Sequence, residues 1–150
     1  MPNSSPVRVA FVCVQNAGRS QMATAFAERE RDRRDAHDRL EIITGGTQPA
    51  DHVHEEVVTV MEDEEFDLAD RTPREVTPEE LQAADYVITM GCSAQDVCPA
   101  TWTGENRDWG LEDPDGQGLD AVREIRDEIG RRVRELFDEL LDEQVQGTSE

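Results

Sequence analysis

A cysteine and an arginine six positions apart near the N-terminus are the residues best suited to do chemistry. Cys13 ends an apolar, valine-rich run, and Arg19 follows a short loop that contains Gly18. The N–H groups of such a loop can converge on an anion, and a helix that begins at Arg19 adds positive potential. A guanidinium group binds two oxygens of a tetrahedral oxyanion. The same field favours the nucleophilic thiolate form of Cys13, so the pattern predicts a reactive thiol beneath a bound oxyanion.

The loop is expected to supply the groups that bind the oxyanion. Its candidate residues are Val14, Gln15, Asn16, Ala17, Gly18, Arg19 and Ser20. Asn16 is expected to bond its own backbone, and Ser20 to stabilise the Cys13 thiolate through its hydroxyl. A plain turn residue and a plain helix N-cap are the alternatives for these two. For the whole pattern, the alternative is a buried core cysteine followed by a solvated arginine.

Strands and helices alternate around this loop. Apolar runs predict strands over residues 7–13, 40–44 and 85–90, and a short fourth strand is expected over 106–110. Apolar residues at helical spacing predict helices opening at 19, over 53–61, from 78 and over 119–140. This alternation indicates a parallel sheet with right-handed crossovers, whose ligands bind beyond the carboxyl ends of the strands. We therefore expect an α/β fold in which Cys13, Gly46, Cys92 and the loop of Asp113 converge at that edge.

The composition is strongly acidic. The chain has 150 residues and a formal net charge of −20, and its 15 lysine-or-arginine positions are all arginine. A lysine-free, acid-rich surface suits molar salt, in which the Debye length falls to ~3 Å and self-repulsion is screened. An extreme halophile is the favoured interpretation, and an acidic partner-binding face is the alternative. Nucleic acid is disfavoured as a partner because no basic stripe is present to meet its phosphates.

The length predicts one domain over residues 1–150, with flexible ends at 1–6 and 144–150. No apolar run approaches the ~20 residues of a membrane-spanning helix, so no membrane partner is expected. The first six residues lack the charged and apolar regions of a signal peptide. Three cysteines, an odd number, fit working thiols in a reducing compartment better than a disulfide framework. A cytoplasmic protein is therefore expected.

Cys92 and Cys98 form a second candidate group of thiols. Their C-x5-C spacing differs from the C-x2–4-C of a zinc knuckle, and the three histidines lie far away in the sequence. No metal site is therefore expected. A helix would hold the two residues ~9 Å apart along its axis, whereas a disulfide requires Cα atoms within about 7 Å. A redox role thus requires a loop or a segment that melts on oxidation, and two small buried hydrophobic residues are the alternative.

Five segments together resemble one known family. They are Cys-Val-Gln-Asn-Ala-Gly-Arg-Ser-Gln-Met-Ala at 13–23, Gly-Thr-Gln-Pro-Ala at 46–50, Val-Ile-Thr-Met-Gly-Cys at 87–92, Asp-Val-Cys-Pro at 96–99 and Trp-Gly-Leu-Glu-Asp-Pro at 109–114. In this order, and along nearly the whole chain, they resemble the arsenate reductases built on the low-molecular-weight tyrosine phosphatase fold. The resemblance implies a four-stranded parallel sheet of order 2-1-3-4 with helices on both faces.

The resemblance also implies a mechanism. The Cys13 thiolate attacks arsenate held by the loop amides and Arg19, and Asp113 acts as general acid for the leaving hydroxide. Cys92 then attacks Cys13 and releases arsenite, which leaves a Cys13–Cys92 disulfide. Cys98 attacks Cys92 in turn, and an external thiol donor such as thioredoxin reduces the resulting Cys92–Cys98 pair. Phosphate and sulfate are expected to compete with arsenate, no cofactor is expected to stay bound, and a monomer is expected.

Some positions depart from the family pattern. The C-x5-C spacing is shorter than the C-x6-C of the best-known thioredoxin-coupled members. Met-Gly-Cys resembles the subgroup that uses low-molecular-weight thiols, so a small-thiol or glutaredoxin system is the alternative donor. Thr24 and Arg74 stand where many members carry acidic residues that hold a potassium ion. No monovalent ion is therefore expected, and Arg74 is expected to place its own charge there.

Two other functions are alternatives. One is a phosphatase for phosphotyrosine or small phosphomonoesters that uses Cys13, Arg19 and Asp113. Against it, the single tyrosine, Tyr86, lies in a predicted strand, and Asp115 stands where phosphatases carry an aromatic residue. Asp113 lies in an ordinary turn sequence, so a turn former is the alternative role for this residue. The other function is a non-catalytic oxyanion sensor or thiol switch.

Overall fold

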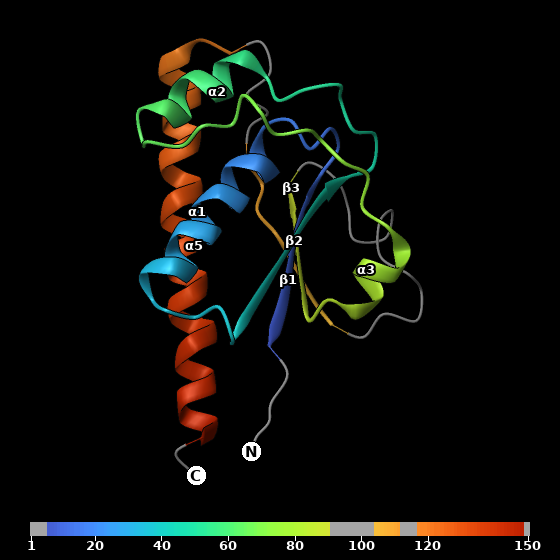
Figure 1. The fold of residues 1–150 in the computed structure, drawn as a ribbon, viewed down its shortest axis with the longest axis vertical. Coiled ribbons are helices and arrows are strands. Elements are labelled where there is room, and N and C mark those ends of the chain that lie inside the picture. The colour runs from blue at the N-terminus through green and yellow to red at the C-terminus, as the bar shows by residue number, and fades with distance from the viewer. Residues whose placement is uncertain (1–5, 91–103, 112–116, 149–150) are drawn as a thin grey trace.

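A parallel sheet forms the centre of the molecule. The structure is a computed structural model that describes residues 6–90, 104–111 and 117–148, with only the backbone described for 142–148. Its strands are β1 (Val7–Cys13), β2 (Leu40–Gly46), β3 (Tyr86–Met90) and β4 (Glu105–Asp108). They form one four-stranded sheet in the order β2-β1-β3-β4, and every pairing is parallel (Figure 1). The expected α/β fold class and strand order are confirmed.

Strand β1 lies inside the sheet and is the strand that leads to Cys13. Its residues from Val9 to Cys13 are buried, as is typical of a strand covered on both faces. At its carboxyl end, Cys13 pairs with Gly46 of β2 on one side and with Met90 of β3 on the other. The thiol therefore starts from a rigid position at the edge of the sheet where ligands bind in α/β folds.

Helices cover both faces of the sheet. They are α1 (Arg19–Arg33), α2 (Glu55–Glu62), α3 (Pro78–Ala83) and α5 (Leu119–Thr148). Figure 1 shows α1, α2 and α5 on one side, where α5 packs against the other two, and α3 on the opposite side. The larger hydrophobic core lies under α1, α2 and α5, and a smaller one lies under α3. In the described part of the chain, no helix is both long and apolar enough to cross a membrane.

Several element boundaries differ from the sequence-based expectations: α2 spans Glu55–Glu62 instead of 53–61, and β3 begins at Tyr86 instead of 85. Strand β2 runs to Gly46, two residues past the predicted end, because its last residues pair with β1. Strand β4 occupies Glu105–Asp108 instead of 106–110, because the chain turns back on itself at 109–111, where the Leu111 N–H donates to the Trp109 carbonyl. Helix α5 continues to Thr148 instead of ending near 140, since glutamate and glutamine extend a helix without an apolar stripe.

An arginine–glutamate network runs along the exposed side of α5. The Arg131 guanidinium donates to Glu128 and Glu135, and Arg132 Nε donates to Glu128 Oε2 at 2.7 Å. Hydrogen bonds from Arg131 and then Arg132 lower the pKa of Glu128 from 4.5 to about 2, against the small opposing effect of burial. Because the pKa is lower in the folded state, these bonds stabilise the protein above about pH 4.5 and lose their effect as the pH falls toward 2.

Replacing Glu128 with glutamine should therefore reveal a pH-dependent contribution to stability. At pH 7 in low salt, the variant is expected to lose under about 1 kcal/mol of unfolding free energy, as for other surface ion pairs. In urea titrations at successive pH values, this gap should stay constant down to about 4.5 and then shrink. Glu124→Gln, an exposed change on the same helix, is the matched control. A gap that does not change with pH would contradict the assignment.

Candidate active site

The loop between β1 and α1 contains one residue in the left-handed backbone conformation. Asn16 has φ of 51°, a conformation that asparagine adopts more readily than most other residues. Cys13, Asn16 and Ser20 are all buried, with 3%, 0% and 0% of their surface exposed. Helix α1 starts at Arg19 after Gly18, which has no side chain to cap the first N–H groups. The sequence-based prediction of a strand, a tight loop and a helix opening at Arg19 is confirmed.

Four carbonyl groups of the loop turn toward one segment of the chain. Residues 47–54 donate N–H bonds to the Cys13, Val14, Gln15 and Ala17 carbonyls, at 3.2, 2.7, 3.0 and 2.9 Å. In a trans peptide, the carbonyl of one residue and the N–H of the next point in opposite directions. The N–H groups of the residues that follow these carbonyls therefore point away from this segment, and that of Asn16 points to the Cys13 sulfur. This arrangement can bind an anion on the side of the thiol.

The hydrogen bonds of Asn16 hold the Ser20 hydroxyl beside the thiol. The Asn16 Oδ1 atom accepts from the Arg74 N–H at 3.0 Å and from Gln21 Nε2 at 3.1 Å. Its Nδ2 therefore lies on the other side and donates to Ser20 Oγ at 2.8 Å. Ser20 Oγ lies 2.8 Å from Cys13 Sγ. When Cys13 is a thiolate it has no hydrogen to give, so the Ser20 hydroxyl donates to the sulfur. With the Asn16 N–H at 3.2 Å, the sulfur accepts two hydrogen bonds, which suits a thiolate.

The expectation for Asn16 is corrected, and the alternative role for Ser20 is excluded. Asn16 does not bond its own backbone: its amide joins Ser20 and also Thr44 Oγ1, 3.0 Å away on β2. Ser20 is not the N-cap of α1, because the helix begins one residue earlier and Gly18 holds the cap position. The contact of Ser20 with the Cys13 sulfur is the one expected.

Arg74 contacts Asn16 of the loop between β1 and α1 and helps to hold it in place. Its main-chain N–H binds Asn16 Oδ1, and its guanidinium donates to the Thr44 carbonyl at 2.6 Å and to Glu80 at 2.9 Å. Burial favours the neutral form of Glu80, but hydrogen bonds from Arg74 and Thr77 outweigh it and lower the pKa of this carboxyl. The sequence drew attention to the charge of Arg74 but did not predict the bond from its backbone to Asn16. The sequence also did not predict that Gln21 and Thr44 bond to Asn16, because no local sequence pattern indicates these contacts.

Arg19 is held by a carbonyl from a distant part of the chain. It is the first residue of α1, has 9% of its surface exposed, and donates from NH1 to the Leu111 carbonyl at 2.9 Å. This bond limits the orientations of the guanidinium plane, which is the group expected to bind two anion oxygens.

The remaining predicted site residues lie outside the described residues: Cys92, Cys98 and Asp113. The structure does place Gly46 beside Cys13, as expected. Within residues 6–90, 104–111 and 117–141, no group of three or more His, Cys, Asp or Glu side chains is arranged to hold a metal ion.

A methyl group at Gly46 should disturb the anion-binding loop directly. An added Cβ would lie 2.5 Å from the Val14 oxygen and 2.9 Å from the Asn16 nitrogen, both of them backbone atoms. Gly46→Ala is expected to destabilise the fold by about 1–3 kcal/mol and to weaken phosphate protection of Cys13 against iodoacetamide. Urea denaturation and mass spectrometry of the Cys13 peptide measure the two effects. Gly118→Ala, whose Cβ would meet nothing within 4 Å, is the control. Unchanged stability and protection in Gly46→Ala would contradict this geometry.

Comparison with known proteins identifies the family. Residues 8–146 match the family described as low molecular weight phosphotyrosine protein phosphatase. The chain belongs to this family. Membership of this family agrees with the four-stranded parallel sheet described above.

Several known proteins are similar to this chain in sequence or in structure. A Halobacterium salinarum protein, provisionally named as an arsenate reductase, is 62% identical over 140 residues, which are 93% of this chain and 97% of that protein. Arsenate reductase 1 of Bacillus cereus is 33% identical over 125 residues, covering 83% of this chain and 89% of the relative. Among solved structures, the thioredoxin-dependent arsenate reductase of Corynebacterium glutamicum matches with a TM-score of 0.73 and 36% identity. That match covers 92% of this chain, which spans 63% of the Corynebacterium chain.

Proposed function

We propose that this protein is an arsenate reductase that converts arsenate to arsenite with thiols as the source of electrons. The observation that carries the proposal is the Cys13 sulfur, which accepts bonds from Ser20 and from the Asn16 N–H at the base of the anion-binding loop. The names of the relatives from Halobacterium salinarum, Bacillus cereus and Corynebacterium glutamicum support arsenate as the anion.

The first step is a displacement at arsenic. Arsenate binds to the loop N–H groups and to Arg19, where its negative charge is stabilised. The Cys13 thiolate attacks arsenic and forms a sulfur–arsenic bond, while one arsenic–oxygen bond breaks. Asp113 gives its proton to the departing oxygen, which leaves as water when a second proton is already on it. Arsenic is still pentavalent in this adduct, so no electrons have been transferred.

The second step transfers the electrons. The Cys92 thiolate attacks the Cys13 sulfur, and the electron pair of the breaking sulfur–arsenic bond moves to arsenic. Arsenic becomes trivalent and leaves as arsenite, while the two thiols are oxidised to a Cys13–Cys92 disulfide. Cys98 then attacks Cys92 and frees Cys13 as a thiolate. An external dithiol reduces the Cys92–Cys98 disulfide and restores the starting state.

One assay tests the proposed reaction and also identifies the electron donor. Fully reduced protein is mixed with arsenate in molar potassium chloride, and arsenite is measured with thioredoxin, glutaredoxin or a small thiol as reductant. Arsenite release with at least one donor, and none from Cys13→Ser, is the expected result. The name of the Corynebacterium relative favours thioredoxin, whereas the Met-Gly-Cys sequence favours a small-thiol system.

A phosphatase is the second candidate function, because the family is described by that activity. The same loop would hold a phosphate ester, and Cys13 would attack phosphorus with Asp113 protonating the leaving group. Rapid hydrolysis of aryl phosphates, together with no arsenite release when any of the reductants is supplied, would favour this function over arsenate reduction. Saturable arsenate binding with neither activity would instead favour an oxyanion sensor.

A further inference from the structure

The guanidinium of Arg19 depends on a three-residue turn at the end of β4. Its NH1 donates to the Leu111 carbonyl at 2.9 Å. The Leu111 N–H in turn donates to the Trp109 carbonyl at 2.8 Å, which closes a turn around Gly110. The orientation of the Leu111 carbonyl is therefore set by where Trp109 lies.

Trp109 is anchored on three sides. Its N–H donates to the Thr89 carbonyl of β3 at 2.9 Å, and its side chain is 7% exposed. The indole ring packs at 6.0 Å and 51° against Phe11, two residues before Cys13 on β1. The Arg132 guanidinium of α5 lies 6.0 Å from the ring centroid, within the range of a cation–π contact. These contacts connect the turn to β1, β3 and α5.

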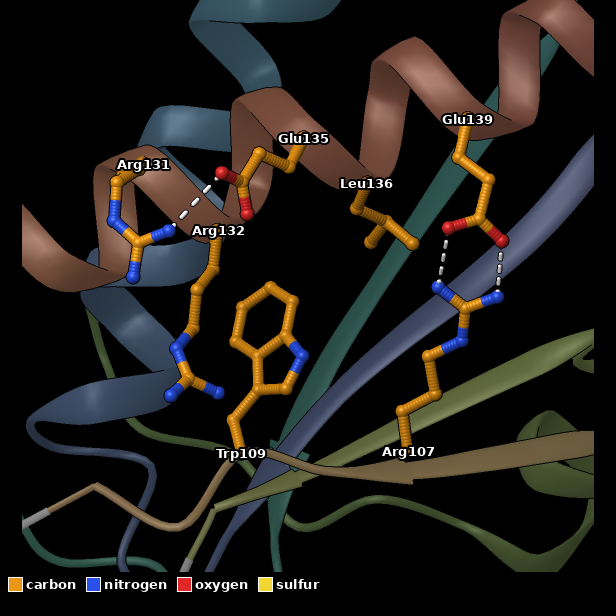
Figure 2. A pocket seen from close by; sticks show the side chains of 7 residues that line it. All are labelled: Arg107, Trp109, Arg131, Arg132, Glu135, Leu136 and Glu139. Carbon is orange, nitrogen blue, oxygen red and sulfur yellow. Dashed lines mark hydrogen bonds and ion pairs between the residues drawn. The ribbon is translucent and has the colours of Figure 1, made fainter.

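A cavity of about 340 Å³ borders the indole ring. Figure 2 shows the ring standing between Arg107 and Arg132 beneath α5. The lining residues are Arg107, Trp109, Arg131, Arg132, Glu135, Leu136 and Glu139. Because space is already present beside the ring, a smaller side chain at 109 would enlarge a cavity that water can enter. The turn would then lose its side-chain contacts with Phe11 and Arg132 and keep only the backbone bond to Thr89.

We propose that Trp109 is a positioning residue for Arg19, acting through the Leu111 carbonyl. The inference rests on the proposed function, since it assigns Arg19 to the oxyanion. A long arginine side chain has many rotamers, and a fixed carbonyl reduces the number that must be lost when the anion binds. The contacts of Trp109 do not include the Cys13 sulfur, whose bonds come from Asn16 and Ser20. Trp109 therefore affects anion binding and leaves the reactivity of the thiol unchanged.

The test separates these two properties in the full-length reduced protein. In Trp109→Leu, the phosphate concentration that half-protects Cys13 from iodoacetamide, and the KM for arsenate, should each rise about ten-fold. The alkylation rate of Cys13 without any anion should stay at the wild-type value. Alkylation is followed by mass spectrometry of the Cys13 peptide, so that the other two thiols do not interfere. Trp109→Phe keeps an aromatic ring beside Phe11 and should restore most of the phosphate protection.

Leu136→Ala is the matched control. Leu136 lines the same cavity and is 3% exposed, so its truncation also removes buried apolar contacts without touching the turn. Its urea midpoint should fall, while phosphate protection stays at the wild-type value. If phosphate protected wild type and Trp109→Leu equally, the role of Trp109 would be overturned, but the oxyanion site would stand. The same would follow if Leu136→Ala lost as much phosphate protection as Trp109→Leu. Absence of phosphate protection in the wild type would overturn the oxyanion site itself, and this inference with it.

Discussion

Replacing Cys92 with serine is expected to reduce arsenite release to the level of a reaction without protein. The same variant should hydrolyse p-nitrophenyl phosphate as fast as the wild type. In the proposed mechanism, the attack of Cys92 on Cys13 is the step that transfers electrons to arsenic, and a serine hydroxyl cannot form the disulfide. Phosphate ester hydrolysis requires only the Cys13 loop, Arg19 and Asp113, so this activity is independent of the second thiol.

The experiment measures both activities on one preparation of Cys92→Ser, with wild type and Cys13→Ser beside it. Cys13→Ser should lose both activities, because it lacks the nucleophile. Cys98→Ser shows whether the third thiol is required for turnover or only for the use of a protein donor. Wild-type arsenite release from Cys92→Ser would refute the relay, since electrons would then reach arsenic by another route.

Replacing Arg19 with lysine is expected to lower kcat/KM for arsenate and for a phosphate ester about 10²–10³-fold. Lysine carries the same charge but lacks the planar pair of N–H donors that binds two oxygens together. The arginine is also held in place by the Leu111 carbonyl, and an ammonium on a flexible stem would lose that fixed plane. The loss should therefore appear with both substrates, because both present a tetrahedral oxyanion.

Arg8→Lys is the control for this change. Arg8 lies near the opposite end of β1 from Cys13, is half-buried, and pairs with Glu41 on β2. Its replacement should leave both activities within about two-fold of the wild type, as for most surface substitutions. If Arg19→Lys kept wild-type kcat/KM with both substrates, the guanidinium would not be the group that binds the anion.

The loop around Cys13 could be predicted from the sequence because its signals are local. The apolar run of β1, the glycine before α1 and the helical spacing that follows all lie within residues 7–28. Each signal favours the same strand, loop and helix, and the structure contains those elements with the expected boundaries. The strand order followed from the family resemblance.

The contacts that fix the site could not be predicted in the same way. Asn16 bonds Thr44 and Arg74, which lie 28 and 58 positions away, and Arg19 bonds a carbonyl 92 positions away. A bond to a main-chain N–H or carbonyl places no demand on the side chain of that residue, so it leaves no pattern to find. The expectation for Asn16 was wrong for this reason: a local bond was inferred where the partners come from two distant segments.

In the proposed reaction, the burial of Cys13 limits how the protein regains its electrons after each turnover. Only 3% of this residue is exposed, and its backbone is paired with β2 on one side and β3 on the other. Thiol–disulfide exchange needs the attacking sulfur to reach the oxidised one directly. A globular donor would have to reach a sulfur that is almost completely buried. Regeneration therefore calls for an intermediary that is either a few atoms in size or part of the same polypeptide.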